Sequence, residues 1–447
     1  MKQLIPDSVS KHDNVYDVLK ERGFIEQSTN EEEVRKLLQN EKVKFYIGFD
    51  PTADCLHVGH FMQVIIMMYM QKYGHTPVVL LGGGTGMVGD PSGRTDMRQL
   101  MDVETIDHNC RQFKKLFERF IEFDDEWKYE GNGGVYQPGH ENKTPEPGKA
   151  VSVNNGEWIR PLNWIEFVRE IGSRFNVNTM LRSEAFKQRM ERESGLTFFE
   201  FSYMLMQSYD FMVMARDFDV KIQFGGDDQW SNIIGGVDLT RKLLQKEVYG
   251  MTFSLLTTSE GKKMGKTQKG ALWLDADRVS PYEFFQYWRN VGDADVNKCL
   301  RMLTFLPMEE VDRLSALEGA EINKAKEILA FEITKLVHGE EEATKALEAS
   351  RQAFGAGGAG AAAADIPTTE MAGADFDGEG KGLVSLLAEL KLAESNGDAR
   401  RTIEQGGVSL NGEKVTDARM NITEANFQDG VLLIQKGKKK FHKIVIK

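Results

Sequence analysis

Polar and apolar residues alternate along positions 43–49, and a long apolar run then occupies positions 61–70. The alternation predicts a β-strand that ends at Asp50, and the apolar run predicts a buried helix. Pro51 and Thr52 separate the two elements and break the strand. A strand followed directly by a buried helix is therefore the first folded element that the sequence indicates.

Two further segments with strand patterns lie downstream, at positions 77–81 and 220–224. The run at 77–81 is continuous, as is typical of a strand that is buried on both faces of a parallel sheet. Strand, helix and strand in this order predict a right-handed βαβ unit, with ligands bound beyond the carboxyl ends of the strands. The pattern predicts an α/β fold with a parallel sheet.

Helical periodicity covers most of the remaining chain. The predicted helical stretches lie at 15–19, 31–39, 103–127, 198–211 and 280–350, and one further predicted stretch ends at Met190. Positions 130–148 are rich in Gly, Pro and Asn and predict a surface insertion without regular structure. A run of Gly and Ala at 354–364 predicts a flexible linker.

The segment beyond this linker has the pattern of a small, separate module. It comprises two predicted helices at 383–390 and 398–405 and a hairpin turn at 406–412. Two closing strands are predicted at 431–434 and 441–446. Positions 381–447 hold 12 Lys and Arg against 8 Asp and Glu, a net charge of +4. The whole chain carries −12, which leaves −16 for the rest. This asymmetry predicts a basic module at the end of an acidic body.

Composition limits the class of protein. A chain of 447 residues predicts two or three domains, and 41% hydrophobic with 28% charged residues is typical of a soluble globular protein. No apolar run is long enough for a membrane span, and the first 30 residues have no signal-peptide core. Three scattered cysteines match neither a metal site nor a disulfide framework, and so predict a cytoplasmic location.

Two histidines, His57 and His60, are expected at the start of the helix that begins near position 61. The free amides of a helix N-terminus attract phosphate, and imidazoles add hydrogen-bond donors for developing phosphate charge. Gly59 leaves no side chain between them, so a nucleotide base could lie against the backbone. The alternative interpretation is a helix cap and a surface pair.

The run 46–60, Tyr-Ile-Gly-Phe-Asp-Pro-Thr-Ala-Asp-Cys-Leu-His-Val-Gly-His, resembles the His-Ile-Gly-His motif of class I aminoacyl-tRNA synthetases, and its full length resembles their tyrosyl branch. Ile47 departs from members that have a ribose-contacting cysteine there. A second motif, 262–267, resembles the Lys-Met-Ser-Lys-Ser loop of that class. Lys263 and Lys266, three residues apart on such a loop, could close over a triphosphate and neutralise charge on the pyrophosphate. Taken alone, this cluster could equally be a solvated surface.

Three polar residues, Tyr203, Gln207 and Asp210, share one face of the otherwise apolar helix at 198–211. Burying polar groups unpaired costs several kcal/mol, so this face predicts either a pocket for a small polar molecule or a surface stripe. The resemblance favours the pocket. It implies that Tyr203, Gln207 and Asp90 hold the tyrosine ammonium, and that Tyr46 and Asp210 bond its phenolic hydroxyl.

The resemblance implies further roles in the activation of L-tyrosine with ATP. The residues that would stabilise the phosphate charge are Thr52, His57, Arg94, Arg98, Lys263, Lys266 and Thr267. His60 would complete this catalytic set by packing at the ribose. Those that would bind ATP are Gly48, Asp50, His57, Gly59, His60, Gly226, Asp228 and Lys266. Gln223 and Gln229 would lie beside the substrate carboxylate and α-carbon, and Mg²⁺ would arrive with ATP. Tyrosine would then pass to the terminal adenosine of its tRNA.

The C-terminal pattern resembles a small RNA-binding domain named for a small-subunit ribosomal protein. The residues expected to contact RNA phosphates are Lys381, Arg400, Arg401, Lys438, Lys439 and Lys440. The resemblance implies tRNA, L-tyrosine and ATP as partners, a homodimer, and neither membrane nor DNA. The dimer interface would lie in the connective segment, at about 103–200.

The sequence thus predicts four parts: a Rossmann-like catalytic domain at 1–254, a lysine loop with a helical tRNA-contacting domain at 255–350, a linker at 351–380, and an α+β RNA-binding domain at 381–447. Three alternatives stay open. They are a tryptophanyl-type synthetase, a nucleotidyltransferase with a related histidine motif, and a non-catalytic RNA-binding relative.

Overall fold

The structure is a computed structural model that describes residues 5–91, 101–127, 145–191, 195–267, 270–354, 367–378, 380–428, 430–437 and 440–446. The side chains of residues 185, 266, 267, 353, 354 and 440 lie outside this description. The chain divides into two compact units, one formed by 1–280 with 289–333, the other by 281–288 with 334–447. No described helix is both long and apolar enough to cross a membrane.

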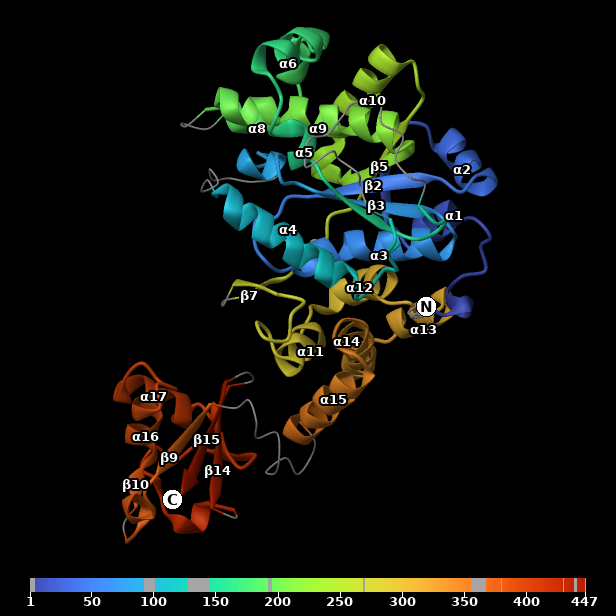
Figure 1. The fold of residues 1–447 in the computed structure, drawn as a ribbon. Coiled ribbons are helices and arrows are strands. Elements are labelled where there is room, and N and C mark those ends of the chain that lie inside the picture. The colour runs from blue at the N-terminus through green and yellow to red at the C-terminus, as the bar shows by residue number, and fades with distance from the viewer. Residues whose placement is uncertain are drawn as a thin grey trace. The chain divides into compact units, whose positions relative to one another are not determined.

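A six-stranded sheet forms the centre of the first unit (Figure 1), in the order β1-β6-β5-β2-β3-β4. Its strands are β1 (Ile25–Ser28), β2 (Lys44–Phe49), β3 (Thr76–Leu81), β4 (Val151–Asn154), β5 (Val220–Gly226) and β6 (Tyr249–Phe253). The strand β1 is antiparallel to β6, and all other neighbours are parallel. The predicted parallel α/β sheet is confirmed, while the edge strands β1 and β4 and the inner strand β6 were not predicted.

Helices cover both faces of this sheet. In Figure 1, α3 (Val58–Lys72) and α4 (Val103–Phe117) lie below it, and α9 (Phe198–Asp217) and α10 (Trp230–Leu244) lie above. The helix α3 contributes ten buried residues to the core, which is why its sequence is almost entirely apolar. The first part of the chain adds α1 (Val15–Glu21) and α2 (Glu31–Asn40), as the pattern predicted.

Two helical predictions need correction. The helix predicted to run to residue 127 ends at Phe117, and Phe120 and Ile121 are buried beyond its end. Burial in a turn produces the same apolar pattern as a helix face, which explains the error. The stretch to Met190 is divided into four short helices: α5 (Gly156–Ile159), α6 (Trp164–Glu170), α7 (Val177–Met180) and α8 (Glu184–Met190). The side chains of Asn163, Asn176 and Ser183 cap the last three.

The lysine motif lies in the same compact unit as the sheet. Residues 256–264 form a hairpin, with Met264 N donating to Leu256 O (2.8 Å) and Thr258 N to Lys262 O (2.7 Å). Beyond it come β7 (Lys266–Thr267) and β8 (Gly270–Ala271). The helices α12 (Val296–Leu303), α13 (Met308–Ser315) and the first part of α14 (Ile322–His338) also belong to this unit, so the predicted boundary at 254/255 does not separate two compact units.

The second unit contains α11 (Pro281–Arg289), α15 (Glu340–Phe354) and the C-terminal module. The module has a sheet of order β12-β11-β14-β15-β9 packed with α16 (Leu383–Glu389) and α17 (Asn396–Glu404). Its strands are β9 (Thr368–Met371), β11 (Val408–Leu410), β12 (Glu413–Val415), β14 (Val431–Lys436) and β15 (Lys440–Ile446), with a separate pair β10 (Lys381–Gly382) and β13 (Asn421–Ile422).

The strand β9 lies within the segment predicted as linker, 351–380. It pairs in parallel with β15, from Thr368 against Lys443 to Met371 against Ile446. Phe376, which follows it, is buried in the core of the module. The ordered module therefore begins before residue 381, because a strand of only four residues with a single buried side chain leaves little pattern in the sequence.

Candidate active site

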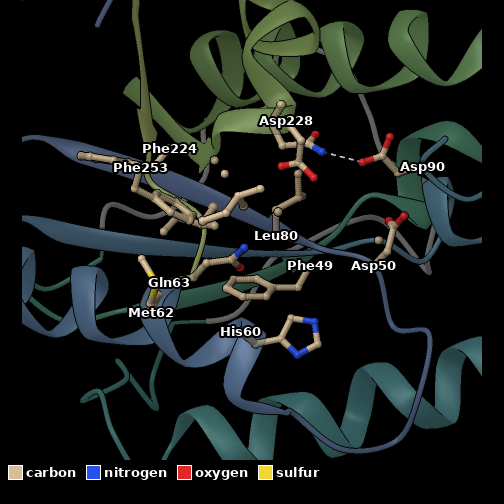
Figure 2. A pocket seen from close by; sticks show the side chains of 18 of the residues that line it. Phe49, Asp50, His60, Met62, Gln63, Leu80, Asp90, Phe224, Asp228 and Phe253 are labelled. Carbon is tan, nitrogen blue, oxygen red and sulfur yellow. Dashed lines mark hydrogen bonds between the residues drawn. The ribbon is translucent and has the colours of Figure 1, made fainter. Parts of the chain in front are cut away.

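A cavity of about 350 Å³ opens at the carboxyl ends of β2, β3 and β5. Figure 2 shows side chains from these strands and from α3 converging on it. Ligands of open parallel sheets bind at this edge, so the cavity lies where the βαβ pattern predicted it. Its lining joins residues that are far apart in the sequence, from Tyr46 to Ala271.

His57 and His60 lie at the first turn of α3, on the cavity wall. Their rings stack, with centroids 3.9 Å apart. His57 Nδ1 accepts from Gly59 N (3.0 Å), and His60 Nδ1 accepts from His57 N (3.3 Å). Because each Nδ1 is an acceptor, the proton of each neutral ring is on Nε2, which becomes a donor. The pair is therefore both a helix cap and a source of two donors beside a helix N-terminus.

Asp210, on α9, is a buried carboxylate held by two neutral donors. Asn155 Nδ2 donates to Oδ2 (2.8 Å) and Trp158 Nε1 donates to Oδ1 (2.7 Å). Burial raises the pKa of Asp210 to about 7, although these two hydrogen bonds lower it. The hydroxyl of Tyr46 is buried in the same cavity and has no hydrogen-bond partner among the described residues. Asp210 and Tyr46 both line the cavity, and burial together with the charge of Asp210 raises the pKa of the Tyr46 hydroxyl, so a ligand group that both donates and accepts would satisfy the two.

A second acid, Asp50, follows the end of β2 and connects three elements. It accepts from the hydroxyl of Tyr203 (3.1 Å) and from Thr85 Oγ1 (2.8 Å). Thr85 Oγ1 in turn accepts from Asn155 Nδ2 (2.9 Å). One network therefore runs from Asp50 to Asp210 along the cavity wall, which fixes the positions of both carboxylates.

An amide network surrounds Asp90, which also lines the cavity (Figure 2). Gln229 Nε2 donates to Asp90 Oδ2 (2.5 Å). Asn232 Nδ2 donates to Gln207 Oε1 (2.9 Å) and to Gln229 Oε1 (3.3 Å). These acceptors and the Asp90 carboxylate form a polar region that could receive a cationic group.

The two adjacent acids after β5 have different surroundings. Asp227 accepts from Gln27 Nε2 (2.6 Å) and Thr252 Oγ1 (3.1 Å), which ties this turn to the strands β1 and β6. Asp228 lines the cavity, where burial raises its pKa and the charge of Lys263 lowers it. The structure therefore assigns Asp228, not Asp227, to the cavity and agrees with the predicted register.

Comparison with known proteins places the chain in a family. The model for tRNA synthetases class I (W and Y) matches residues 38–355. The chain belongs to this family. A second model, the C-terminal domain of the tyrosine–tRNA ligase SYY-like type, matches residues 360–444.

Individual relatives agree with this class I assignment. Tyrosine–tRNA ligases of Clostridium botulinum and Clostridium perfringens are each 54% identical over 433 residues, 97% of this chain and 99% of theirs. A C-terminally truncated mitochondrial tyrosyl-tRNA synthetase from Aspergillus nidulans has a TM-score of 0.64 and 28% identity, over 77% of this chain and 95% of its own. The Rossmann-like α/β fold is shown by these relatives.

Most residues that the class I resemblance singled out converge on the one cavity. Those that line it are Tyr46, Gly48, Asp50, Thr52, His57, Gly59, His60, Asp90, Tyr203, Gln207, Asp210, Gln223, Gly226, Asp228, Gln229 and Lys263. Arg94 and Arg98 lie outside the described residues, as do the side chains of Lys266 and Thr267.

The expected RNA contacts belong to the second unit. Arg400 and Arg401 are exposed on α17, and Lys381 pairs with Glu389 at 2.6 Å. Lys438, Lys439 and the side chain of Lys440 lie outside the described residues, as does most of the predicted insertion.

Three residues of the site had no assigned role in the sequence analysis: Thr85, Asn155 and Trp158. Asn155 comes directly after β4, and Thr85 follows β3 in the glycine-rich loop. Polar residues just beyond buried strands are a recognisable signal. That signal was lost at Asn155 because the short strand β4 was not predicted.

Proposed function

We propose that the chain is a tyrosine–tRNA ligase, which activates L-tyrosine with ATP and transfers it to its tRNA. The observation that carries this proposal is the buried carboxylate of Asp210, fixed by Asn155 and Trp158, in the cavity that the buried hydroxyl of Tyr46 also lines. A phenol donates to the carboxylate and accepts from the hydroxyl, whereas an indole only donates. This pair therefore favours tyrosine over tryptophan.

The proposed orientation of tyrosine follows from the charges along the cavity. Its ring would lie between Tyr46 and the helix α9, with the phenol at Asp210. Its ammonium would face Asp90 and the oxygen of Gln207, since a carboxylate and amide oxygens accept from a cation. Its carboxylate would then point toward the first turn of α3.

The first chemical step needs no nucleophile from the protein. An oxygen of the tyrosine carboxylate bonds to the α-phosphorus of ATP, the bond from that phosphorus to the bridging oxygen breaks, and pyrophosphate leaves. His57, His60 and Lys263 are proposed to stabilise the developing charge, and Asp228 to accept from the ribose. Mg²⁺ is part of the substrate, bound to the ATP phosphates. A terminal ribose hydroxyl of tRNA then attacks the tyrosyl carbonyl, and AMP leaves.

A charging assay tests this proposal directly. Purified protein, ATP, Mg²⁺, radiolabelled tyrosine and total bacterial tRNA are expected to give acid-precipitable tyrosine that depends on all components. Radiolabelled tryptophan is expected to give none. Incorporation of tryptophan in place of tyrosine would contradict the proposal and favour the tryptophanyl alternative.

Tyrosine affinity is expected to depend on pH through Asp210. The ionised carboxylate is the better acceptor for the phenol proton, so affinity rises as pH increases through about 7, the pKa given above. In Trp158→Phe the carboxylate loses a donor that lowers its pKa, so the rise shifts to higher pH. Equilibrium dialysis with tyrosine from pH 6 to 8.5 measures both curves. Identical curves for the two proteins would contradict this account.

We also propose that two copies of the chain form a homodimer through an apolar patch on α6 and the start of α9. Trp164, Ile165 and Phe198 are 54, 70 and 63% exposed. The rings of Trp164 and Phe198 pack edge to face, with their centroids 6.0 Å apart. Val168 and Phe199 extend this patch. Exposed clusters of large apolar residues mark interaction surfaces, and this one lies in the segment predicted to dimerise.

The patch can be tested by introducing a charge. Ile165→Asp is expected to convert a dimer of about twice the chain mass into a monomer, measured by light scattering after size exclusion. The matched control is Val103→Asp on α4, which is also an exposed apolar residue and should leave the dimer intact. A dimeric Ile165→Asp protein would contradict the proposed interface.

The C-terminal module is proposed to bind tRNA phosphates through the exposed arginines of α17. Replacing Arg400 and Arg401 with glutamine is expected to raise the KM for tRNA by about 10-fold. The slope of log K for tRNA binding against log salt concentration should become shallower by about one to two, because one or two phosphate contacts are lost. Activation of tyrosine without tRNA should not change. An unchanged salt dependence in a filter-binding assay would contradict this role.

The proposed place of action is the cytoplasm, where tRNA is charged. All three cysteines, Cys55, Cys110 and Cys299, are buried free thiols, which suits a reducing compartment.

A further inference from the structure

We propose that Lys298 and Asp295, at the start of α12, are positioning residues that hold the 256–264 hairpin so that Lys263 faces the cavity. This inference rests on the proposed function, because it assigns these residues a role in tyrosine activation. Neither residue touches the cavity. Their effect would be transmitted through the hairpin.

Lys298 binds the first strand of the hairpin with its ammonium. Nζ donates to Leu255 O (3.0 Å), Thr257 O (3.4 Å) and Thr257 Oγ1 (3.3 Å). An ammonium has three N–H donors, and here all three acceptors belong to the short segment 255–257. Charged donors to a partly buried carbonyl are stronger than neutral ones. The root of the hairpin is therefore fixed to α12.

Asp295 fixes the tip of the same hairpin. It is only 6% exposed, and its Oδ1 accepts from Ser259 N at 2.6 Å. A third contact comes from Cys299, whose Sγ lies 3.7 Å from Sδ of Met264. Asp295, Lys298 and Cys299 stand at positions i, i+3 and i+4, so one face of the helix start contacts both strands of the hairpin.

The other side of the hairpin is joined to the histidine motif. Leu272 N donates to Gly265 O (2.7 Å), and Val58 N donates to Leu272 O (2.9 Å). Gly265 has φ = 80° and lies so close to Val58 that an added Cβ would be 3.0 Å from the Val58 Cβ. The lysine motif is thus held between α12 on one side and the first turn of α3 on the other, which sets the distance from Lys263 to the histidines.

This arrangement matters because stabilisation of a transition state depends on placement. A misplacement of about 1 Å from a change far from the chemistry can lower a rate by about 10²-fold. The proposed tyrosine site is built on β2 and α9, whereas the hydrogen bonds of the Lys298 ammonium to described residues go to Leu255 and Thr257. Loss of the anchor should therefore slow activation and leave tyrosine binding unchanged.

The test compares Lys298→Met with the parent protein in tyrosine-dependent ATP–pyrophosphate exchange. Methionine keeps most of the side-chain length and removes the donors. We expect kcat/KM for ATP to fall by about 10-fold, the dissociation constant for tyrosine to stay within about twofold, and Lys298→Arg to restore most of the rate. Asp295→Ala, which removes the acceptor for Ser259 N, is the second variant and should show the same split if Lys298→Met fails to fold.

The matched control is Lys246→Met. Lys246 also donates to a main-chain carbonyl, Ala215 O at 3.0 Å, but it lies after α10 and away from the hairpin. Its exchange rate should equal that of the parent. If the exchange rate of Lys246→Met fell as much as that of Lys298→Met, the loss of any lysine that donates to a main-chain carbonyl would have the same effect. That result would overturn the inference.

A double variant separates positioning from general destabilisation. If Lys298 acts through Lys263, adding Lys298→Met to Lys263→Ala should cost less than about twofold beyond Lys263→Ala alone. Full additivity, or a Lys298→Met protein that exchanges at the parent rate, would overturn the inference. Absence of exchange in the parent itself would instead overturn the proposed function, so the two failures are distinguishable.

Discussion

Replacement of Asp210 with alanine is expected to lower kcat/KM for tyrosine by about 10²–10³-fold, because losing one partner of a buried, charged hydrogen bond costs about 3–4 kcal/mol. The change removes the acceptor for the phenol proton. It also leaves the donors of Asn155 and Trp158 without their present acceptor inside the protein. Steady-state charging of tRNA with tyrosine measures the loss.

Specificity separates this loss from a general defect. A site built to bond a hydroxyl rejects the analogue that lacks it by about 10⁴–10⁵-fold, and tyrosyl-tRNA synthetases are a known example of this behaviour. In Asp210→Ala the ratio of kcat/KM for tyrosine over phenylalanine is expected to collapse, since phenylalanine never used the carboxylate. The control is Asp238→Ala, a partly exposed acid paired with Arg241 on α10. An unchanged ratio in Asp210→Ala would contradict the assigned phenol site.

Replacement of Lys263 with alanine is expected to lower kcat for ATP–pyrophosphate exchange by about 10²-fold while the affinity for tyrosine stays constant. Lys263 lines the cavity and acts electrostatically on Asp228, across from the histidines. Its charge would be used only as negative charge develops on the leaving pyrophosphate. An interaction made only in the transition state lowers kcat without weakening substrate binding.

The neighbouring lysine gives a close control. Lys262 is exposed, its ammonium pairs with Glu260 at 2.8 Å, and it does not line the cavity. Lys262→Ala removes the same charge from the same hairpin and is expected to change the exchange rate by less than about threefold, as surface charges contribute little. Equal losses in the two variants would show that only the net charge of the loop matters, and would contradict a specific role for Lys263.

The sequence predicted the centre of this site because its signals are local. The strand ending at Asp50, the helix that starts by His57 and the stripe of Tyr203, Gln207 and Asp210 each follow from periodicity within one element. The parallel sheet then brings the ends of these elements together. Local pattern and sheet topology therefore anticipated the position of the cavity and the ends of these elements, whereas most of the other lining residues, such as Asp90, Asp228 and Lys263, were expected only from the resemblance to class I synthetases.

The support around the site could not be predicted in the same way. The clamp on Asp210 depends on Asn155, which follows a strand of four residues, and the anchor of the lysine hairpin depends on Lys298, more than thirty residues away from it. A polar residue in contact with a distant backbone has no periodic signature. Short strands such as β4 and β9 likewise take their stability from pairing, not from a long apolar pattern of their own.

Tyrosine-dependent ATP–pyrophosphate exchange without tRNA tests the central claim most directly. Purified protein is incubated with ATP, Mg²⁺ and labelled pyrophosphate, with tyrosine, phenylalanine or tryptophan in parallel. The account predicts rapid label exchange into ATP with tyrosine alone, because only a phenol satisfies Asp210 and Tyr46 together. Exchange with tryptophan, or no exchange with any of the three amino acids, would contradict it.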